Sequence, residues 1–338
     1  MAETTPILRL PTGMRDHAPE AASARRRVVD GLLATFERRG FARVITPAFE
    51  YEEVLALGLG DAARAATLRF VEPSSGEVVA LRPDITPQIA RLIATRYRHE
   101  KGPVRLCYEG TVVRLERGAR GQREVMQAGV ELAGVAGAAG DAEAIALAVE
   151  ALAAVGLVRP TIDLGHLGLA REVLSALELP APQLELVRRR IAKRDVAGLG
   201  ELLGDGRTPI RKFVMSLSEL NGPPSLLSNM DRVPKAARPA FAELREIVSV
   251  LEKKKLDARL HVDLGEVRGF DYYTGVRFQA FVPGAPDAVL SGGRYDALLG
   301  RYGRPSPAVG FAVDVDAVAG ALEQQHENAK PKPKAKGK

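Results

Sequence analysis

The chain has 338 residues, of which 46% are hydrophobic and 27% are charged, as is usual for a soluble globular protein. Tryptophan is absent and aromatic residues make up 5%, which argues against a surface that stacks unpaired nucleic-acid bases. The net charge of +6 predicts no folded basic surface, because five Lys and one Glu after residue 325 carry +4 of it. We expect residues 1–325 to form the folded core and residues 326–338 to be a disordered Lys-rich tail.

The cysteine count and the N-terminal residues indicate the cellular compartment. Cys107 is the only cysteine, which excludes an intrachain disulfide and favours a reducing environment. The N-terminal segment lacks the apolar stretch of a signal peptide, and the longest apolar run, residues 144–158, is too short to span a bilayer. We therefore expect a cytoplasmic protein.

The first hundred residues predict helices separated by short strands. Pro19 opens a helix whose apolar residues recur with a 3.6-residue period, and Gly40 ends it. Residues 41–46 favour a strand, and residues 69–81 favour a β-hairpin.

The segment DITPQ is typical of a helix start. Thr86 is expected to be the N-cap and Pro87 the first helical residue. Asp84 then lies just before a helix N-terminus, where the helix dipole favours its ionised form.

The rest of the chain predicts strands in runs, interrupted by one long helical segment. Strands are expected at residues 104–108, 111–115, 124–133, 161–164, 259–264, 276–281 and 308–313. Asp141 is expected to cap an Ala-rich helix, residues 167–255 to form a helical insertion, and residues 314–325 to form a last helix. Because the strands do not alternate strictly with helices, we expect an α+β fold with an antiparallel sheet and flanking helices.

Familiar metal and nucleotide motifs are missing from the sequence. Gly58-x-Gly60-x-x-Ala63 matches a loose dinucleotide fingerprint, but the residues before it favour a helix where the motif needs a strand. The sequence has no GxxxxGK[ST], HExxH or CxxC motif, and its five His are scattered. We expect no metal site and no bound cofactor.

The first polar segment with possible site chemistry is RLERGARGQREVMQAGVE, residues 114–131. Arg114 and Glu116 share one strand face, and Gln127 and Glu131 share one face of the next strand. Taken alone, Arg114 or Glu116 needs no ligand, because a surface ion pair, which contributes under about 1 kcal/mol, is a sufficient role for it. Gln127 and Glu131 lie in an otherwise apolar strand, where buried polar groups need partners that a ligand can supply.

The second polar segment, residues 266–296, lies in the C-terminal half. Arg268 precedes Asp271 and a tyrosine pair, and residues 291–296 (SGGRYD) favour a tight turn onto a helix, where glycines let the backbone approach a ligand. Tyrosine pairs and glycine turns are also common in structural roles. Together the two segments predict a pocket for a small zwitterion with a polar side chain.

Seven segments, in order over about residues 8–320, resemble the catalytic core of the class II aminoacyl-tRNA synthetases. They are PTGMRDHAP, GFARVITPAFE, LRPDITPQIAR, YEGTVVRLE…QAGVELAG, VRGFDYYTG, SGGRYDALL and PAVGFAVDV. The pair RGFDYY and GGRYD is specific for the histidyl branch. The resemblance is weakest through the helical insertion, and it implies a class II synthetase-like fold.

The resemblance also implies a histidine pocket. Its residues would be Asp84 (where the family has Glu), Thr86, Arg114, Gln127, Glu131, Arg268, Tyr272, Tyr273 and Tyr295. Carboxylates would neutralise the α-ammonium group and an arginine would hold the α-carboxylate. Glu131 and a tyrosine hydroxyl would bond the two imidazole nitrogens.

Two departures from the family concern ATP. Ala317 stands where the third family motif has an ATP-binding arginine, and Val125 stands where an aromatic residue stacks on adenine. An arginine that stabilises phosphates is worth a few kcal/mol, so its loss disfavours adenylate chemistry. The chain also ends shortly after its last expected helix, so we expect no anticodon-binding domain, although the family carries one. We therefore expect no catalytic residues.

Among families with this core, the profile resembles the regulatory subunits of ATP phosphoribosyltransferase. That resemblance implies a non-catalytic protein that activates the first step of histidine biosynthesis and confers feedback inhibition by histidine. Its partners would be the short-form catalytic subunit and L-histidine, without tRNA or membrane. We expect a homodimer, formed through residues 41–50, within a hetero-oligomer.

Two alternatives stay open. One is a truncated histidyl-tRNA synthetase or an amino-acid ligase that activates histidine with ATP, which would catalyse histidine-dependent pyrophosphate exchange. The other is a free-standing amino-acid sensor with different partners.

Overall fold

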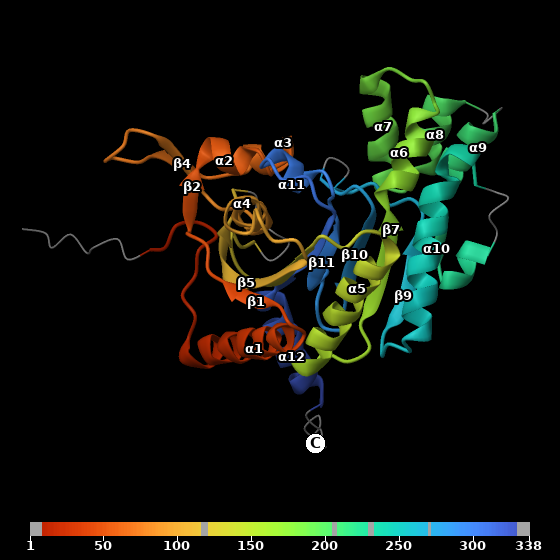
Figure 1. The fold of residues 1–338 in the computed structure, drawn as a ribbon. Helices are drawn as coiled ribbons and strands as arrows, with labels where there is room; N and C mark the ends of the chain where they lie inside the picture. Colours follow the sequence, from red (N-terminus) through yellow and green to blue (C-terminus); the bar gives the residue numbers. More distant parts are fainter. Residues whose placement is uncertain (1–8, 116–120, 205–207, 229–232, 270–271, 330–338) are drawn as a thin grey trace, which may run out of the picture.

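The computed structural model describes residues 9–115, 121–204, 208–228, 233–269 and 272–329 (Figure 1). The helices are α1 (Pro19–Arg38), α2 (Glu52–Ala56), α3 (Asp61–Ala65), α4 (Thr86–Arg96), α5 (Gly137–Ala154), α6 (Leu167–Ser175), α7 (Ala181–Ala192), α8 (Val196–Leu203), α9 (Pro209–Ser216), α10 (Arg238–Lys253), α11 (Leu298–Arg301) and α12 (Val315–Ala329). Within the described ranges, no helix has both the length and the apolar character needed to cross a bilayer.

The strands form a large mixed sheet and a small antiparallel one. They are β1 (Ala42–Val44), β2 (Phe49–Tyr51), β3 (Arg69–Val71), β4 (Val78–Leu81), β5 (Val104–Val113), β6 (Glu124–Ala133), β7 (Thr161–His166), β8 (Asn221–Gly222), β9 (Arg259–Asp263), β10 (Val276–Phe281), β11 (Leu290–Arg294) and β12 (Ala308–Asp314). The large sheet has the order β1-β5-β6-β12-β11-β10-β7-β9-β8, and the small sheet has the order β2-β4-β3. Within the large sheet β1–β5 and β7–β9 are parallel pairs, and the other pairs are antiparallel.

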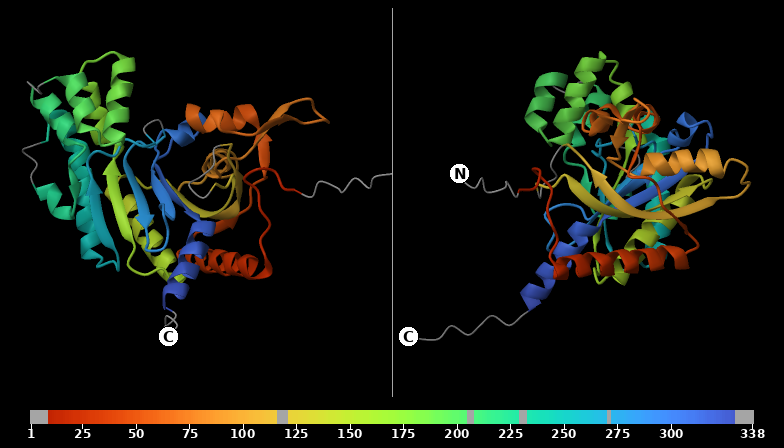
Figure 2. Two further views of the ribbon diagram at one scale, coloured as in Figure 1. Left: turned by 180° about the vertical axis from the view of Figure 1, so that it is seen from behind. Right: turned by 90° about the vertical axis from the view of Figure 1, so that its left-hand side faces the viewer.

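Helices cover the large sheet and confirm the predicted α+β class. On one side of the sheet α1 contacts both α5 and α12 (Figure 1). Phe36 of α1 meets Phe311 of β12 edge to face, with ring centroids 5.7 Å apart, and this contact anchors the predicted apolar stripe on the sheet. The small sheet and the helices α6–α9 lie at opposite ends of the molecule (Figures 1 and 2).

Alternation along β6 separates a core face from a polar face. Ala128, Val130 and Leu132 are fully buried in the core that also contains the α1 stripe. Side chains of a strand point alternately to opposite faces, so Gln127 and Glu131 lie together on the other side of the sheet. This is the shared face that the strand spacing predicts.

The strand predictions for residues 104–108 and 111–115 are wrong in one respect. Both segments belong to one strand, β5, which pairs with β6 along its whole length. Gly110 in its middle does not end the strand. Instead, the glycine leaves room for the buried Arg82 side chain, because a Cβ atom there would overlap the guanidinium group.

The predicted tight turn at residues 291–296 is also wrong, since residues 290–294 form β11 in the middle of the sheet. The two glycines serve packing. A Cβ atom on Gly292 would lie 2.6 Å from the Phe278 ring, and one on Gly293 would lie 2.7 Å from the Tyr273 ring. Glycine in a strand here marks the close approach of aromatic rings.

Two expectations about helix ends need correction. Asp141 does not cap α5, which begins at Gly137, but lies fully buried inside the helix and is bonded to Arg294. α12 continues to Ala329, so residues 326–329 of the expected tail are helical, and residues 330–338 lie outside the described part.

Candidate functional site

A cavity of about 200 Å³, which we call the first cavity, lies between the start of α4 and strands β6, β11 and β12. Seven of the nine expected site residues line it: Asp84, Thr86, Arg114, Gln127, Tyr272, Tyr273 and Tyr295. The remaining two, Glu131 and Arg268, lie next to it in different places. Glu116 and Asp271, also considered from the sequence, lie outside the described residues.

Glu131 does not line the first cavity but is buried next to it, beside Thr86 and Tyr295, which do line it. Tyr108 on the neighbouring strand donates a hydrogen bond from Oη to Glu131 Oε1 at 3.3 Å. Gly310 on β12 pairs with Glu131 on β6, and a Cβ atom at Gly310 would overlap Glu131 Oε2. Burial raises the pKa of Glu131 well above its ordinary value, and the nearby Asp84 carboxylate adds to the effect.

Four polar atoms around the first cavity are buried without a hydrogen-bond partner among the described residues. They are Gln127 Oε1, Glu131 Oε2, Tyr272 Oη and Tyr295 Oη. A buried polar atom that lacks a partner costs roughly 1–3 kcal/mol. Two acceptors and two hydroxyl groups around one small space therefore favour a polar ligand that can pair with them.

Asp84 combines a structural role with a place in the cavity wall. Its Oδ1 accepts a hydrogen bond from the Thr86 amide at 3.2 Å, at the first residue of α4. Thr86 is therefore the first helical residue and not the N-cap that the sequence predicts; Ile85 is at the N-cap, without a side-chain cap. Asp84 thus gives the cavity wall a carboxyl group that suits a cationic ammonium group, and the carboxyl group of Glu131 is buried next to the cavity.

Three tyrosines form an aromatic side of the first cavity. The ring of Tyr272 lies 5.0 Å from that of Tyr273 and 5.3 Å from that of Tyr295, measured between centroids. Burial, aided by the carboxyl groups of Asp84 and Glu131, raises the pKa of Tyr272 well above its ordinary value. The Tyr272 hydroxyl therefore stays protonated and can donate a hydrogen bond.

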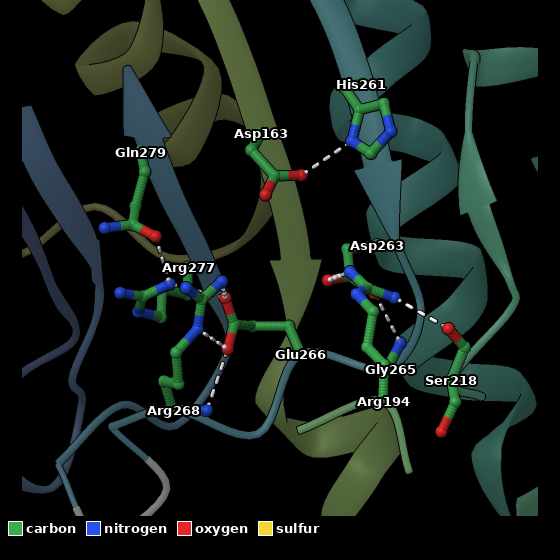
Figure 3. A network of polar contacts seen from close by, with 10 residues as sticks. All are labelled: Asp163, Arg194, Ser218, His261, Asp263, Gly265, Glu266, Arg268, Arg277 and Gln279. Carbon is green, nitrogen blue, oxygen red and sulfur yellow. Dashed lines mark hydrogen bonds and ion pairs between the residues drawn. The ribbon is translucent and has the colours of Figure 1, made fainter. Parts of the chain in front are cut away.

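The two arginines lie on the side where a second cavity of about 600 Å³ adjoins the first. Arg114 lines both cavities, and its Nε donates to the Pro83 carbonyl at 2.8 Å. Arg268 lines only the second cavity, and its guanidinium bonds both carboxylate oxygens of Glu266 at 2.9 and 2.6 Å (Figure 3). The structure thus places Arg114, but not Arg268, in the first cavity.

The end of the first cavity near α12 lacks groups that would hold a nucleotide. Val125 lines it, and Ala317 is buried in the first turn of α12, with its amide bonded to Asp314 Oδ1 at 2.8 Å. Among the described residues that line this cavity, Arg114 is the single cation. A triphosphate would therefore find little positive charge there.

Sequence reasoning missed two features of the site. The first is the hydrogen bond from Tyr108 to Glu131, because nothing in the sequence distinguishes this tyrosine from any other buried tyrosine in a strand. The second cavity is lined partly by residues 58–60 and by α7 of the helical insertion, two segments far apart in the sequence. The glycines dismissed as a chance dinucleotide fingerprint lie in a loop before α3, without the strand that the motif requires.

Comparisons with known proteins agree with this geometry. The histidyl-tRNA synthetase family profile matches residues 13–318. An ATP phosphoribosyltransferase regulatory subunit of Syntrophotalea carbinolica is 41% identical over 335 residues, covering 98% of this chain and 78% of the relative. A regulatory subunit of the same name from Anaeromyxobacter dehalogenans is 43% identical over 322 residues, covering 94% of this chain and 92% of the relative. The chain belongs to the ATP phosphoribosyltransferase regulatory subunit family.

Solved structures show that this family shares the histidyl-tRNA synthetase fold. An ATP phosphoribosyltransferase regulatory subunit/histidyl-tRNA synthetase from Bacillus halodurans superposes with a TM-score of 0.85 at 29% identity, covering 94% of this chain and 84% of the other. A histidine–tRNA ligase subunit from Alicyclobacillus acidocaldarius gives a TM-score of 0.81 at 29% identity, covering 95% and 99%. The class II synthetase-like architecture expected from the sequence is therefore confirmed.

Proposed function

We propose that this chain is a non-catalytic regulatory subunit that assembles with the short-form catalytic subunit of ATP phosphoribosyltransferase, activates it and confers inhibition by histidine. One observation supports the proposal above the others. Buried polar groups without partners surround the first cavity and suit an amino acid. At the end of the cavity near α12, Val125 and Ala317 stand where the synthetase family has the aromatic residue and the arginine that bind ATP. The names of the relatives support the same role.

Histidine would be bound by complementary charges and hydrogen bonds. Asp84 lies where it can neutralise the α-ammonium group, and Arg114 is the cation available for the α-carboxylate. Glu131 and the hydroxyl of Tyr272 or Tyr295 are the candidates for the two imidazole nitrogens. Thr86, Gln127 and Tyr273 complete the pocket, and a direct contact from Arg268 would require it to leave Glu266.

Inhibition follows from linkage between histidine binding and the state of the assembly. If histidine prefers the less active state, that state binds histidine more tightly by the same factor. A coupling free energy of about 1–3 kcal/mol corresponds to a 5- to 150-fold effect, which is enough for feedback control.

Mixing the purified chain with the short-form catalytic subunit tests the proposal. Turnover should rise at least about fivefold on addition of the chain and fall again when histidine is added. Unchanged turnover with and without histidine contradicts the regulatory role. Histidine-dependent pyrophosphate exchange by the chain alone would instead support a histidine-activating enzyme.

An exposed apolar surface around the small sheet supports the proposed homodimer. Ile45 is 81% exposed and Val71 is 61% exposed, and these residues belong to a larger set of exposed apolar side chains. The others are Phe49, Tyr51, Phe70 and Val78. Exposed apolar side chains concentrated in one small sheet and the segment before it are typical of an interface, and this set overlaps residues 41–50.

The variant Ile45→Lys/Val71→Lys should therefore be monomeric in sedimentation velocity at concentrations where the wild type is a dimer. Two unpaired charges within an apolar interface oppose association. The matched control is Leu186→Lys/Val196→Lys, which alters exposed apolar residues of the helical insertion and should leave the dimer intact. A dimeric Ile45/Val71 variant would exclude this surface.

A further inference from the structure

Ser291 of β11 lines the first cavity on the same face of the large sheet as Gln127 and Glu131. It pairs with Ala312 of β12, and Ala312 pairs with Gly129 of β6. Residues directly opposite each other in neighbouring strands share a face, so all these residues lie on one side of the sheet. The two residues between Ser291 and β6 carry a methyl group or no side chain, which leaves the Ser291 hydroxyl open to the cavity.

Two residues of β10 fix the direction of the hydrogen bond that Ser291 makes. Arg277 donates to Gln279 Oε1 at 3.0 Å and also to Glu266 Oε2 (Figure 3). An arginine side chain has donors only, so the oxygen of the Gln279 amide must face it. The amide nitrogen therefore faces the other way and donates to Ser291 Oγ at 3.1 Å.

Ser291 is thus the acceptor in its bond with Gln279, and its own proton remains for another partner. A serine hydroxyl has one proton to donate and two lone pairs that accept. Within the described ranges, no group accepts a hydrogen bond from Ser291 Oγ. The hydroxyl therefore offers a donor to the molecule that occupies the first cavity.

The carboxylate is the group of an amino acid that most needs this donor, because it can only accept. Arg114 is the single cation among the described residues that line the cavity, and its Nε already bonds the Pro83 carbonyl. The ammonium group, in contrast, has acceptors in Asp84 and Gln127 Oε1. In the sheet β12 separates β6 from β11, so a ligand whose imidazole meets Glu131 over β6 extends its other end toward β11.

We propose that Ser291 is a specificity-determining residue of the first cavity, whose hydroxyl group donates a hydrogen bond to the carboxylate of the bound amino acid. Gln279 and Arg277 are positioning residues, because they set the direction of this hydrogen bond. The inference rests on the proposed function, since it requires an amino acid in this cavity, and it adds a residue to those expected from the sequence.

Calorimetric titration with histidine and with histamine, which lacks the carboxylate, tests the inference. Ser291→Ala should bind histidine about tenfold more weakly than the wild type does, because a hydrogen bond to a charged group is lost. Histamine should bind to the two proteins with affinities within about twofold of each other, since it has no carboxylate to lose a donor. The matched control is Ser216→Ala, which removes a half-buried hydroxyl of the helical insertion and should leave histidine binding unchanged.

A second variant tests the direction of the hydrogen bond. Gln279→Glu replaces the amide donor by an acceptor, so the Ser291 proton turns toward the new carboxylate and away from the ligand. The affinity for histidine should fall at least about tenfold. In the Ser291→Ala background the same substitution should cost less than about threefold, because no hydroxyl remains to be turned and Arg277 neutralises the new charge.

Three results would overturn the inference: histidine binding that Ser291→Ala leaves unchanged, an equal loss for histamine, or an equal cost of Gln279→Glu in both backgrounds. Where histamine binds too weakly to be measured, the histidine titrations of the single and double variants decide. A wild-type protein that binds no histidine contradicts the proposed function, and this inference with it. Wild-type binding that does not depend on Ser291 contradicts the inference alone.

Discussion

Replacing Glu131 by alanine is expected to weaken histidine binding about 100-fold in calorimetry. The imidazole of a bound histidine would lose a charged or strongly polar partner, and a buried N–H group without a partner costs roughly 1–3 kcal/mol or more. Glu131 Oε2 is buried next to the first cavity and has no hydrogen-bond partner among the described residues, and we expect a bound imidazole to supply one. Because Tyr108 keeps Oε1 in place, the carboxyl group is already oriented before histidine binds.

Two further variants separate this effect from damage to the fold. Glu131→Gln retains the shape and one acceptor, so it should bind histidine with an affinity between those of the wild type and the alanine variant. Glu124→Ala, at the exposed start of the same strand, should bind within twofold of the wild type. If Glu131→Ala binds histidine as tightly as the wild type does, the first cavity is not the histidine site.

Arg294→Met is expected to lower the free energy of unfolding by about 3–5 kcal/mol at pH 8, because it breaks a buried ion pair. Arg294 is 3% exposed and Asp141 is 0% exposed, and Arg294 Nε donates to Asp141 Oδ1 at 2.8 Å. The same guanidinium bonds the carbonyls of Val135 and Gly137, which join β6 to α5. Methionine would leave these acceptors and one carboxylate without partners in the core.

The loss should depend on pH. Burial raises the pKa of Asp141 to about 6, and Arg294 acts in the opposite direction. Since the folded-state pKa is above the unfolded value, the contribution of Asp141 to stability is complete below about pH 4 and is lost as the pH rises through about 6. Without Arg294 the pKa rises further, so stability continues to fall at higher pH. The loss caused by Arg294→Met should therefore be smaller at pH 5 than at pH 8.

Urea unfolding followed by circular dichroism at both pH values checks this result. Asp141→Asn in the Arg294→Met background should recover part of the stability at pH 8, because the unpaired charge is gone. Arg26→Met, which removes an exposed pair with Asp30, is the control and should change stability little. Equal losses at pH 5 and pH 8 would show that the buried charge is not the cause.

Local sequence patterns predict most helices and strands of this fold because their signals lie within one element. The apolar period of α1 and the hairpin at residues 69–81 both occur as expected. The errors occur where a distant contact decides. From the sequence alone Gly110 indicates a strand break, but in the structure it makes room for the side chain of Arg82. Asp141 likewise indicates a helix cap, but in the structure it binds Arg294 of β11.

The candidate site follows the same division. Strand alternation and the family resemblance identify the residues of the first cavity, and the structure brings seven of them together. The resemblance cannot determine which way Arg268 points, because that depends on Glu266, a residue outside the family motif that the sequence analysis left without a role. Tyr108 was missed for a similar reason, since its contact with Glu131 appears only when β5 and β6 pair.

The walls of the first cavity come from strands in opposite halves of the chain, since β6 pairs directly with β12. Pairing over such a separation in sequence is slow to form, because the long intervening loop must close first. Any molecule that binds there must wait for the completed domain. It therefore shifts the folding equilibrium by mass action without assisting earlier intermediates. If the ligand is the proposed amino acid, its concentration would therefore set the fraction of the subunit that is folded.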